Sequence, residues 1–198
     1  MKPLRLTQAG LLTLWLLGAC VSVLPEPETP DALYRIEAST NGPTLSENLL
    51  IREPEASRIF AGSALVSEDS QGAVRLVRGA EWADPATRML QLALADSFTH
   101  SPTGAAVLPE TGVRARYALS SRLTMLGFVR GEAVCRVSVS LIETRSRALI
   151  TQTRIVTSQN PSSVETGDRA VALKGAAQDC VAEMAKFAAD QLTDIAAQ

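Results

Sequence analysis

The chain reads RYALSSRLTM at residues 116–125, VCRVSVSLIET at residues 134–144 and ALITQTRIVTS at residues 148–158. In the first two stretches apolar and polar side chains largely alternate, which is the two-residue period of a strand with one buried face. Only Arg145-Ser146-Arg147 separates the second stretch from the third, so these two strands are expected to pair as an antiparallel hairpin. The sequence therefore predicts an antiparallel sheet that is covered on one face.

Two flanking segments carry the helical period instead. Between residues 85 and 99, and again between 168 and 196, apolar residues recur at steps of three and four. Asp84 is expected to cap the first helix, with Pro85 at its first position. Shorter strands are expected at residues 32–38, 48–52, 64–67 and 73–78. We predict an α+β fold in which two amphipathic helices pack on one face of the sheet.

Composition excludes several classes of protein. The chain has 198 residues, 46% hydrophobic and 20% charged, with a net charge of -2, as expected for one globular domain that does not bind nucleic acid. Three cysteines and one histidine, His100, are too few for an ordinary zinc site. No phosphate-loop, dinucleotide, nucleophile-elbow or metalloprotease motif occurs. We predict no catalytic residue, cofactor or metal, and we expect Glu68 and Asp69 to form a solvated turn rather than a metal pair.

The N-terminus has the pattern of a bacterial export signal. Lys2 and Arg5 precede an apolar run that is too short to span a membrane, and residues 1–19 are predicted to be a signal peptide. The sequence Leu-Gly-Ala-Cys at residues 17–20 resembles a lipobox, in which Cys20 would carry acyl chains. In lipoproteins with such a lipobox, an aspartate directly after the cysteine commonly retains the protein at the inner membrane. This chain has Val21 at that position, so the resemblance favours the periplasmic face of the outer membrane. The alternatives are an ordinary signal peptide with an incidental cysteine, or a cytosolic protein with an apolar N-terminus.

Residues 20–31 are predicted to form a tether, because Pro25, Pro27 and Pro30 favour an extended chain. At ~3.1 Å per residue such a chain reaches roughly 30 Å from the membrane. The folded domain is expected to occupy residues 32–198.

The two remaining cysteines face the same predicted interface. Cys135 shares its strand face with apolar residues, and Cys180 lies on the apolar stripe of the last helix. In an oxidising periplasm they are candidates for a disulfide, whose loop of about 45 residues would contribute roughly 4 kcal/mol. The alternative is two buried free thiols that pack as small hydrophobic side chains.

Arginines accumulate around the strands. One interpretation is a face that receives phosphate headgroups or an acidic partner, because guanidinium groups suit such ligands. The other interpretation, which we favour, is an ordinary solvated sheet face. The residues concerned are Arg114, Arg116, Arg122, Arg136, Arg147 and Arg154.

The order of these features resembles the ABC-type transport auxiliary lipoproteins that accompany MCE-domain lipid transporters. Besides the lipobox, the resemblance rests on Leu-Tyr-Arg-Ile at residues 33–36 and Glu-Trp-Ala-Asp-Pro at residues 81–85. The chain departs from the family at Arg88, where a hydrophobic residue is common.

The resemblance implies a non-enzymatic lipoprotein, anchored in the outer membrane and facing the periplasm. Its implied partners are an MCE-domain protein, an ABC permease and ATPase, and phospholipid. Only Cys20 transfers as a functional residue, the site of lipid attachment. The alternative is another outer-membrane lipoprotein that acts as an assembly factor or a structural binding module.

Overall fold

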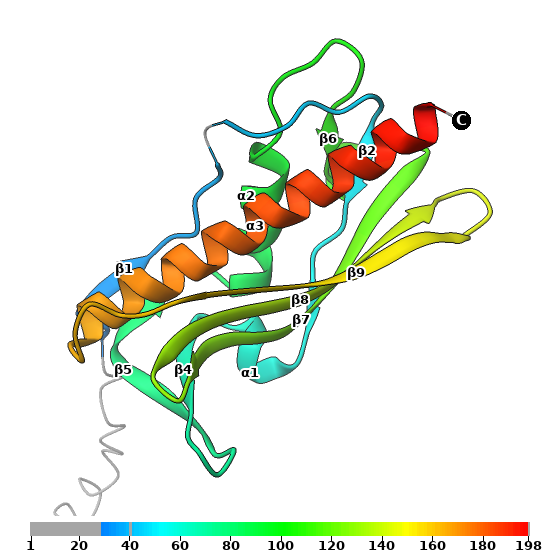
Figure 1. Cartoon of the computed structure of the whole chain (residues 1–198). Helices are drawn as coiled ribbons and strands as arrows, with labels where there is room; N and C mark the ends of the chain where they lie inside the picture. Colours follow the sequence, from blue (N-terminus) through cyan, green and yellow to red (C-terminus); the bar gives the residue numbers. More distant parts are fainter. Residues whose placement is uncertain (1–28, 40, 198) are drawn as a thin grey trace, which may run out of the picture.

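The computed structural model describes residues 29–39 and 41–197 (Figure 1). The expected signal peptide, Cys20 and most of the tether lie outside the described residues. The strands are β1 (Ala32–Tyr34), β2 (Leu49–Ile51), β3 (Glu55–Ala56), β4 (Ala64–Glu68), β5 (Val74–Trp82), β6 (Ala106–Val107), β7 (Tyr117–Val129), β8 (Glu132–Glu143) and β9 (Leu149–Gln159). The helices are α1 (Arg58–Ala61), α2 (Ala86–Asp96), the 3-10 turn η1 (Pro109–Thr111) and α3 (Thr166–Ala196).

β7 organises the sheet. Its 13 residues pair along one edge with antiparallel β8, which pairs in turn with antiparallel β9. The other edge of β7 is shared by three short parallel strands: β2 at its start, β3 in its middle and β4 at its end. β4 continues antiparallel to β5, and β5 pairs in parallel with β1. One long strand therefore joins two halves of a single mixed sheet.

The approach of β4 to β7 depends on a glycine. A Cβ atom added at Gly127 would lie 2.6 Å from both the carbonyl oxygen and Cγ2 of Val66. A real side chain does not fit at such distances, so Gly127 allows β4 to lie against the end of β7.

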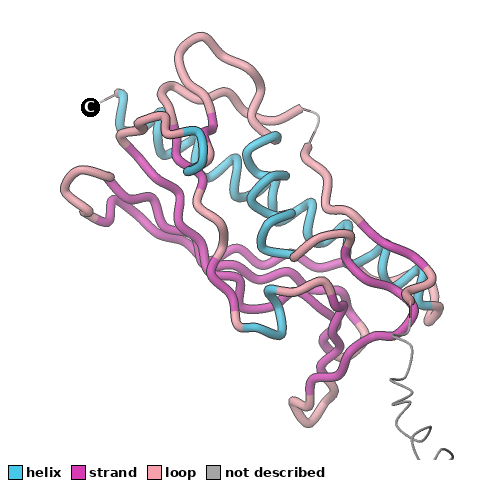
Figure 2. Tube along the Cα trace, turned by 180° about the vertical axis from the view of Figure 1, so that it is seen from behind, coloured by secondary structure: helices cyan, strands magenta, loops and turns pink. Residues whose placement is uncertain are grey.

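Helices α2 and α3 supply the hydrophobic cover. α3 runs along β8 and β9, and α2 lies beside it (Figures 1 and 2). The interface is formed by alternate residues of β8, from Cys135 to Leu141, and by a stripe of α3 that includes Leu173, Cys180 and Met184. All of these side chains are almost fully buried, as the alternation and the helical period indicate. None of the helices in the described residues is both long and apolar enough to cross a membrane.

The predicted α+β class and the long elements are confirmed. Two features differ: the sheet contains parallel pairings beside the antiparallel ones, and a short third helix, α1, precedes β4. The prediction that Asp84 caps α2 is wrong, because α2 begins at Ala86 after Pro85 and has no side-chain cap. The backbone N–H of Ala86 instead donates to the carbonyl oxygen of Gly62 at 3.1 Å, which replaces the missing cap.

Candidate functional site

A groove of about 1010 Å³ opens at one end of the sheet. Three connections that are distant in sequence form its walls: the β4–β5 turn, the β7–β8 turn and the link from β9 to α3. We call it the arginine groove, because its walls include Arg130, Arg136 and Arg169. Its position follows from topology, since the ends of β4 and β7 are parallel neighbours.

The β7–β8 turn presents Arg130. Val129 pairs with Glu132, so Arg130 and Gly131 form a two-residue hairpin loop. Both have positive φ angles, 53° and 92°, as the tight hairpin turns compatible with strand twist require. The backbone N–H of Arg130 donates to the carbonyl oxygen of Glu68 at 3.4 Å, which ties this turn to β4.

The other two arginines come from regular elements. Arg136 is half-buried on the outer face of β8, in register with Met125 of β7 and Val156 of β9. The guanidinium of Arg169, near the start of α3, lies 4.3 Å from the ring centroid of Phe128. It also donates to the Ser67 hydroxyl at 3.5 Å. The cation–π contact fixes its direction while leaving most of its N–H donors available.

The charges of the groove are incompletely paired. None of the three arginines forms an ion pair with any residue that the structure describes. Three carboxylates, Glu68, Asp69 and Glu132, share the walls. Asp69 is occupied, because it accepts the backbone N–H groups of Ala73 and Gln71 and contacts Arg75 at 3.4 Å.

Those two backbone hydrogen bonds, from Ala73 first and Gln71 second, lower the pKa of Asp69. The carboxylate closes the β4–β5 turn, which confirms that Asp69 belongs to a solvated turn. No cluster of metal-binding side chains occurs among residues 29–39 and 41–197.

Apolar side chains form the rest of the rim. Val156 is 53% exposed and Val164 is 89% exposed, and both line the groove together with Pro161. An exposed valine beside unpaired arginines gives the groove an amphipathic character. It presents guanidinium groups next to a hydrophobic edge.

The groove lies at the end where the described chain begins. The backbone N–H of Asp31 donates to the Gly79 carbonyl oxygen at 3.0 Å. A Cβ atom on Gly79 would lie 2.8 Å from Oδ2 of Asp31 and 3.9 Å from Cγ2 of Thr166, the first residue of α3. Figure 1 shows β1, the start of α3 and the β4–β5 hairpin at this same end. The residues immediately before β1 therefore lie near the groove.

Most of the arginines flagged in the sequence lie elsewhere. Arg116 pairs with Glu143 at 3.5 Å and lies 5.0 Å from the Tyr117 ring centroid. Arg122 pairs with Glu55 at 3.5 Å. Of the six arginines predicted near the strands only Arg136 lines the groove, and the sequence analysis does not predict Arg130 or Arg169. The glycine after Arg130, between two alternating strands, is the sequence signal that indicates its turn.

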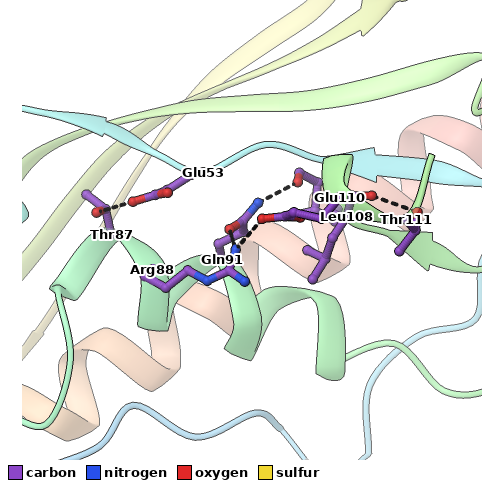
Figure 3. A network of polar contacts seen from close by, with 8 residues as sticks. Glu53, Thr87, Arg88, Gln91, Leu108, Glu110 and Thr111 are labelled. Carbon is purple, nitrogen blue, oxygen red and sulfur yellow. Dashed lines mark hydrogen bonds and ion pairs between the residues drawn. The ribbon is translucent and has the colours of Figure 1, made fainter. Parts of the chain in front are cut away.

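A second polar network holds α2 in place and is structural. Gln91 is 1% exposed and donates to the Ile51 carbonyl oxygen at 2.9 Å (Figure 3). Arg88 donates to Gln91 and to Glu110, and Thr87 donates to Glu53. Arg88, the departure from the family pattern, thus bridges α2 to η1. A charged residue is tolerated there because it has a carboxylate partner.

The two cysteines of the domain meet in the core. Cys135 of β8 and Cys180 of α3 are fully buried free thiols in the structure. A hydrogen bond with the Cys180 thiol, together with burial, raises the pKa of Cys135 well above its usual value. The shared helix–sheet interface is therefore as expected, and the disulfide stays a prediction.

We expect Cys135 and Cys180 to form that disulfide in exported protein, by transferring two electrons and two protons to a periplasmic thiol oxidant. Alkylation of the denatured, unreduced protein should then label neither residue, and prior reduction should expose both to the reagent. In Cys180→Ser protein, Cys135 should be labelled without reduction. Stoichiometric labelling of both cysteines in the unreduced wild-type protein contradicts the bond.

The chain matches a known family over most of its length. A model of the family described as ABC-type transport auxiliary lipoprotein component matches residues 32–186. A crystal structure of a Xanthomonas campestris protein of the DUF330 family is similar, with a TM-score of 0.71 at 20% identity, covering 86% of this chain and 99% of that one. A hypothetical protein from Chlamydia trachomatis has a TM-score of 0.52 at 8% identity, covering 75% of this chain and 99% of that one. These two likenesses support the fold alone, and no curated protein matches the sequence.

Proposed function

Because the chain belongs to the family of ABC-type transport auxiliary lipoprotein components, we propose that it serves an MCE-type lipid transporter linking the inner and outer membranes. The observation that carries the proposal is the family match over residues 32–186. The lipobox-like sequence that ends at Cys20 supports it independently, because it lies outside the matched region.

On this proposal the chain has three parts. Residues 1–19 form the signal peptide, residues 20–31 the acylated cysteine and tether, and residues 32–198 the auxiliary domain. Acylation of Cys20 anchors the protein in the outer membrane, where the domain faces the periplasm. Several acyl chains together give a durable anchor, because each buried methylene contributes about 0.8 kcal/mol.

The proposed role is non-enzymatic. An auxiliary component positions other subunits or their cargo, while the ATPase of the transporter supplies the energy. On this account the chain contacts an MCE-domain protein in the periplasm, and phospholipid is the transported molecule. The position of the groove near the tether supports a role close to the membrane surface.

Phospholipid exchange between the two membranes tests this proposal. Cells that lack the chain should move pulse-labelled phospholipid between inner and outer membranes more slowly, to the same extent as cells that lack the transporter ATPase. A plasmid encoding the wild-type chain should restore the rate. If loss of the ATPase slows exchange while loss of this chain does not, the lipid-transport role is wrong and the chain is another kind of envelope lipoprotein.

A further inference from the structure

We propose that the arginine groove binds the headgroup of a glycerophospholipid, with its phosphate held by Arg136 and Arg169. This inference rests on the proposed anchoring of the chain at a membrane, and it adds a lipid-contacting site to the domain itself. Arg130 lies in the same wall, at the tip of the β7–β8 hairpin.

The chemistry of the walls suits a phosphodiester. Guanidinium groups bind phosphate oxygens through parallel N–H donors, and such charge-assisted hydrogen bonds are among the strongest in proteins. The three arginines come from a turn, a strand and a helix, and none is neutralised by a described carboxylate. Arg169 is also oriented in advance by Phe128 and Ser67, so binding costs it little side-chain entropy.

The remaining groups distinguish a phospholipid from a simple anion. Glu68 and Glu132 line the same groove and make no described ion pair, so they suit the ammonium group of an ethanolamine headgroup. Val156 and Val164 offer an exposed apolar edge to the glycerol and the first methylenes. A phosphate ion would use only the arginines, whereas a lipid would use all three kinds of group.

The groove also lies close to the proposed membrane anchor. The described chain begins beside the start of α3, at the groove end of the domain. Anchoring through the preceding residues therefore keeps the groove within reach of headgroups. Binding of an acidic peptide would not require the groove to lie near a membrane. Such binding is the competing outcome of the test below.

Photo-crosslinking of the full-length, lipidated chain tests the site. The chain is reconstituted into vesicles of phosphatidylethanolamine and phosphatidylglycerol that contain a photoactivatable phosphatidylethanolamine, and crosslinked peptides are mapped by mass spectrometry. Crosslinks should fall in residues 129–136 and 156–169. Arg136→Gln and Arg169→Gln should each reduce them about tenfold, the loss expected for one charge-assisted contact.

Two further variants keep the test informative. Arg130→Asn retains a residue that tolerates positive φ, and it should reduce crosslinking even if Arg169→Gln unfolds the protein. Arg154→Gln is the matched control, because Arg154 is an exposed arginine of β9 that does not line the groove and makes no described ion pair. It should leave crosslinking unchanged.

Two results would overturn the site. One is equal crosslinking in folded Arg136→Gln, Arg130→Asn and wild-type protein. The other is complete displacement of the lipid by millimolar inorganic phosphate or by an acidic peptide, which would identify a general anion site. Neither result affects the proposed partnership with a transporter, because that claim is tested by lipid exchange in cells.

Discussion

Cys20→Ser is expected to abolish acylation and to shift the protein from the outer-membrane fraction to a precursor or a soluble periplasmic form. Serine cannot take the place of the lipobox cysteine as the acylated first residue. The expected effect is large, because each acyl methylene buried in the bilayer contributes about 0.8 kcal/mol to membrane binding and the variant loses all of them.

Membrane fractionation and the intact mass of the mature protein measure this outcome. Cys135→Ser is the matched control, since it also replaces a cysteine by serine but in the buried interface. That variant should remain in the outer membrane and keep the mass of its acyl chains. A Cys20→Ser protein that fractionates as the wild type does would show that the lipoprotein interpretation is wrong.

Trp82→Ala is expected to destabilise the domain by about 3–5 kcal/mol, the usual cost of removing a buried tryptophan side chain. Trp82 ends β5, is 2% exposed and lies in the core beside the start of α2. Its backbone N–H donates to the Ser63 carbonyl oxygen at 2.7 Å, and its register partner on β1 is Tyr34. The backbone of Trp82 is therefore tied to β1 and to the segment before β4, while its side chain is buried in the core.

Denaturant unfolding followed by circular dichroism measures this change, because the variant removes the tryptophan that fluorescence would report. Leu76→Ala is the matched control on the same strand, where Leu76 is 61% exposed, and it should change the free energy of unfolding little. If Trp82→Ala keeps its melting temperature and loses lipid transport, Trp82 contacts a ligand rather than stabilising the core.

The long strands and helices can be predicted from the sequence because each repeats its spacing of apolar residues several times. The alternation in β7 and β8 predicts two strands and their buried faces, including that of Cys135, whereas β9 is predicted from the short polar segment that precedes it. The 31-residue α3 was similarly evident. By contrast β3, β6 and α1 contain four residues or fewer, too short to show any period.

The parallel pairings were not predictable for a different reason. Periodicity identifies a strand and its buried face, but it carries no information on which edge of β7 a distant segment will use. The same limit applies to the arginine groove, whose walls come from residues 68–72, 129–136 and 156–169. Arg136 is a candidate from the sequence because it lies in an alternating strand, whereas nothing in the sequence distinguishes Arg169, because a helix surface ordinarily carries arginine.

Capping at α2 shows how tertiary contacts replace local signals. Asp84 and Pro85 have the residue types of a helix start, and α2 begins within two residues of them. The carbonyl oxygen of Gly62, 24 positions before Ala86, accepts the N–H that a side-chain cap would have satisfied. The position of the helix was therefore predictable, whereas its hydrogen-bond partner was not.

Affinity purification of the lipidated chain from its own membranes, in a mild detergent, tests the central claim most directly. A tag after Gln198 leaves Cys20 free for acylation, and mass spectrometry identifies the proteins retained. We expect an ABC ATPase, a permease and an MCE-domain protein in stable proportion to the chain, and their loss with the released Cys20→Ser form. A wild-type chain that is fully acylated, folded and purified without any transporter subunit would contradict the account.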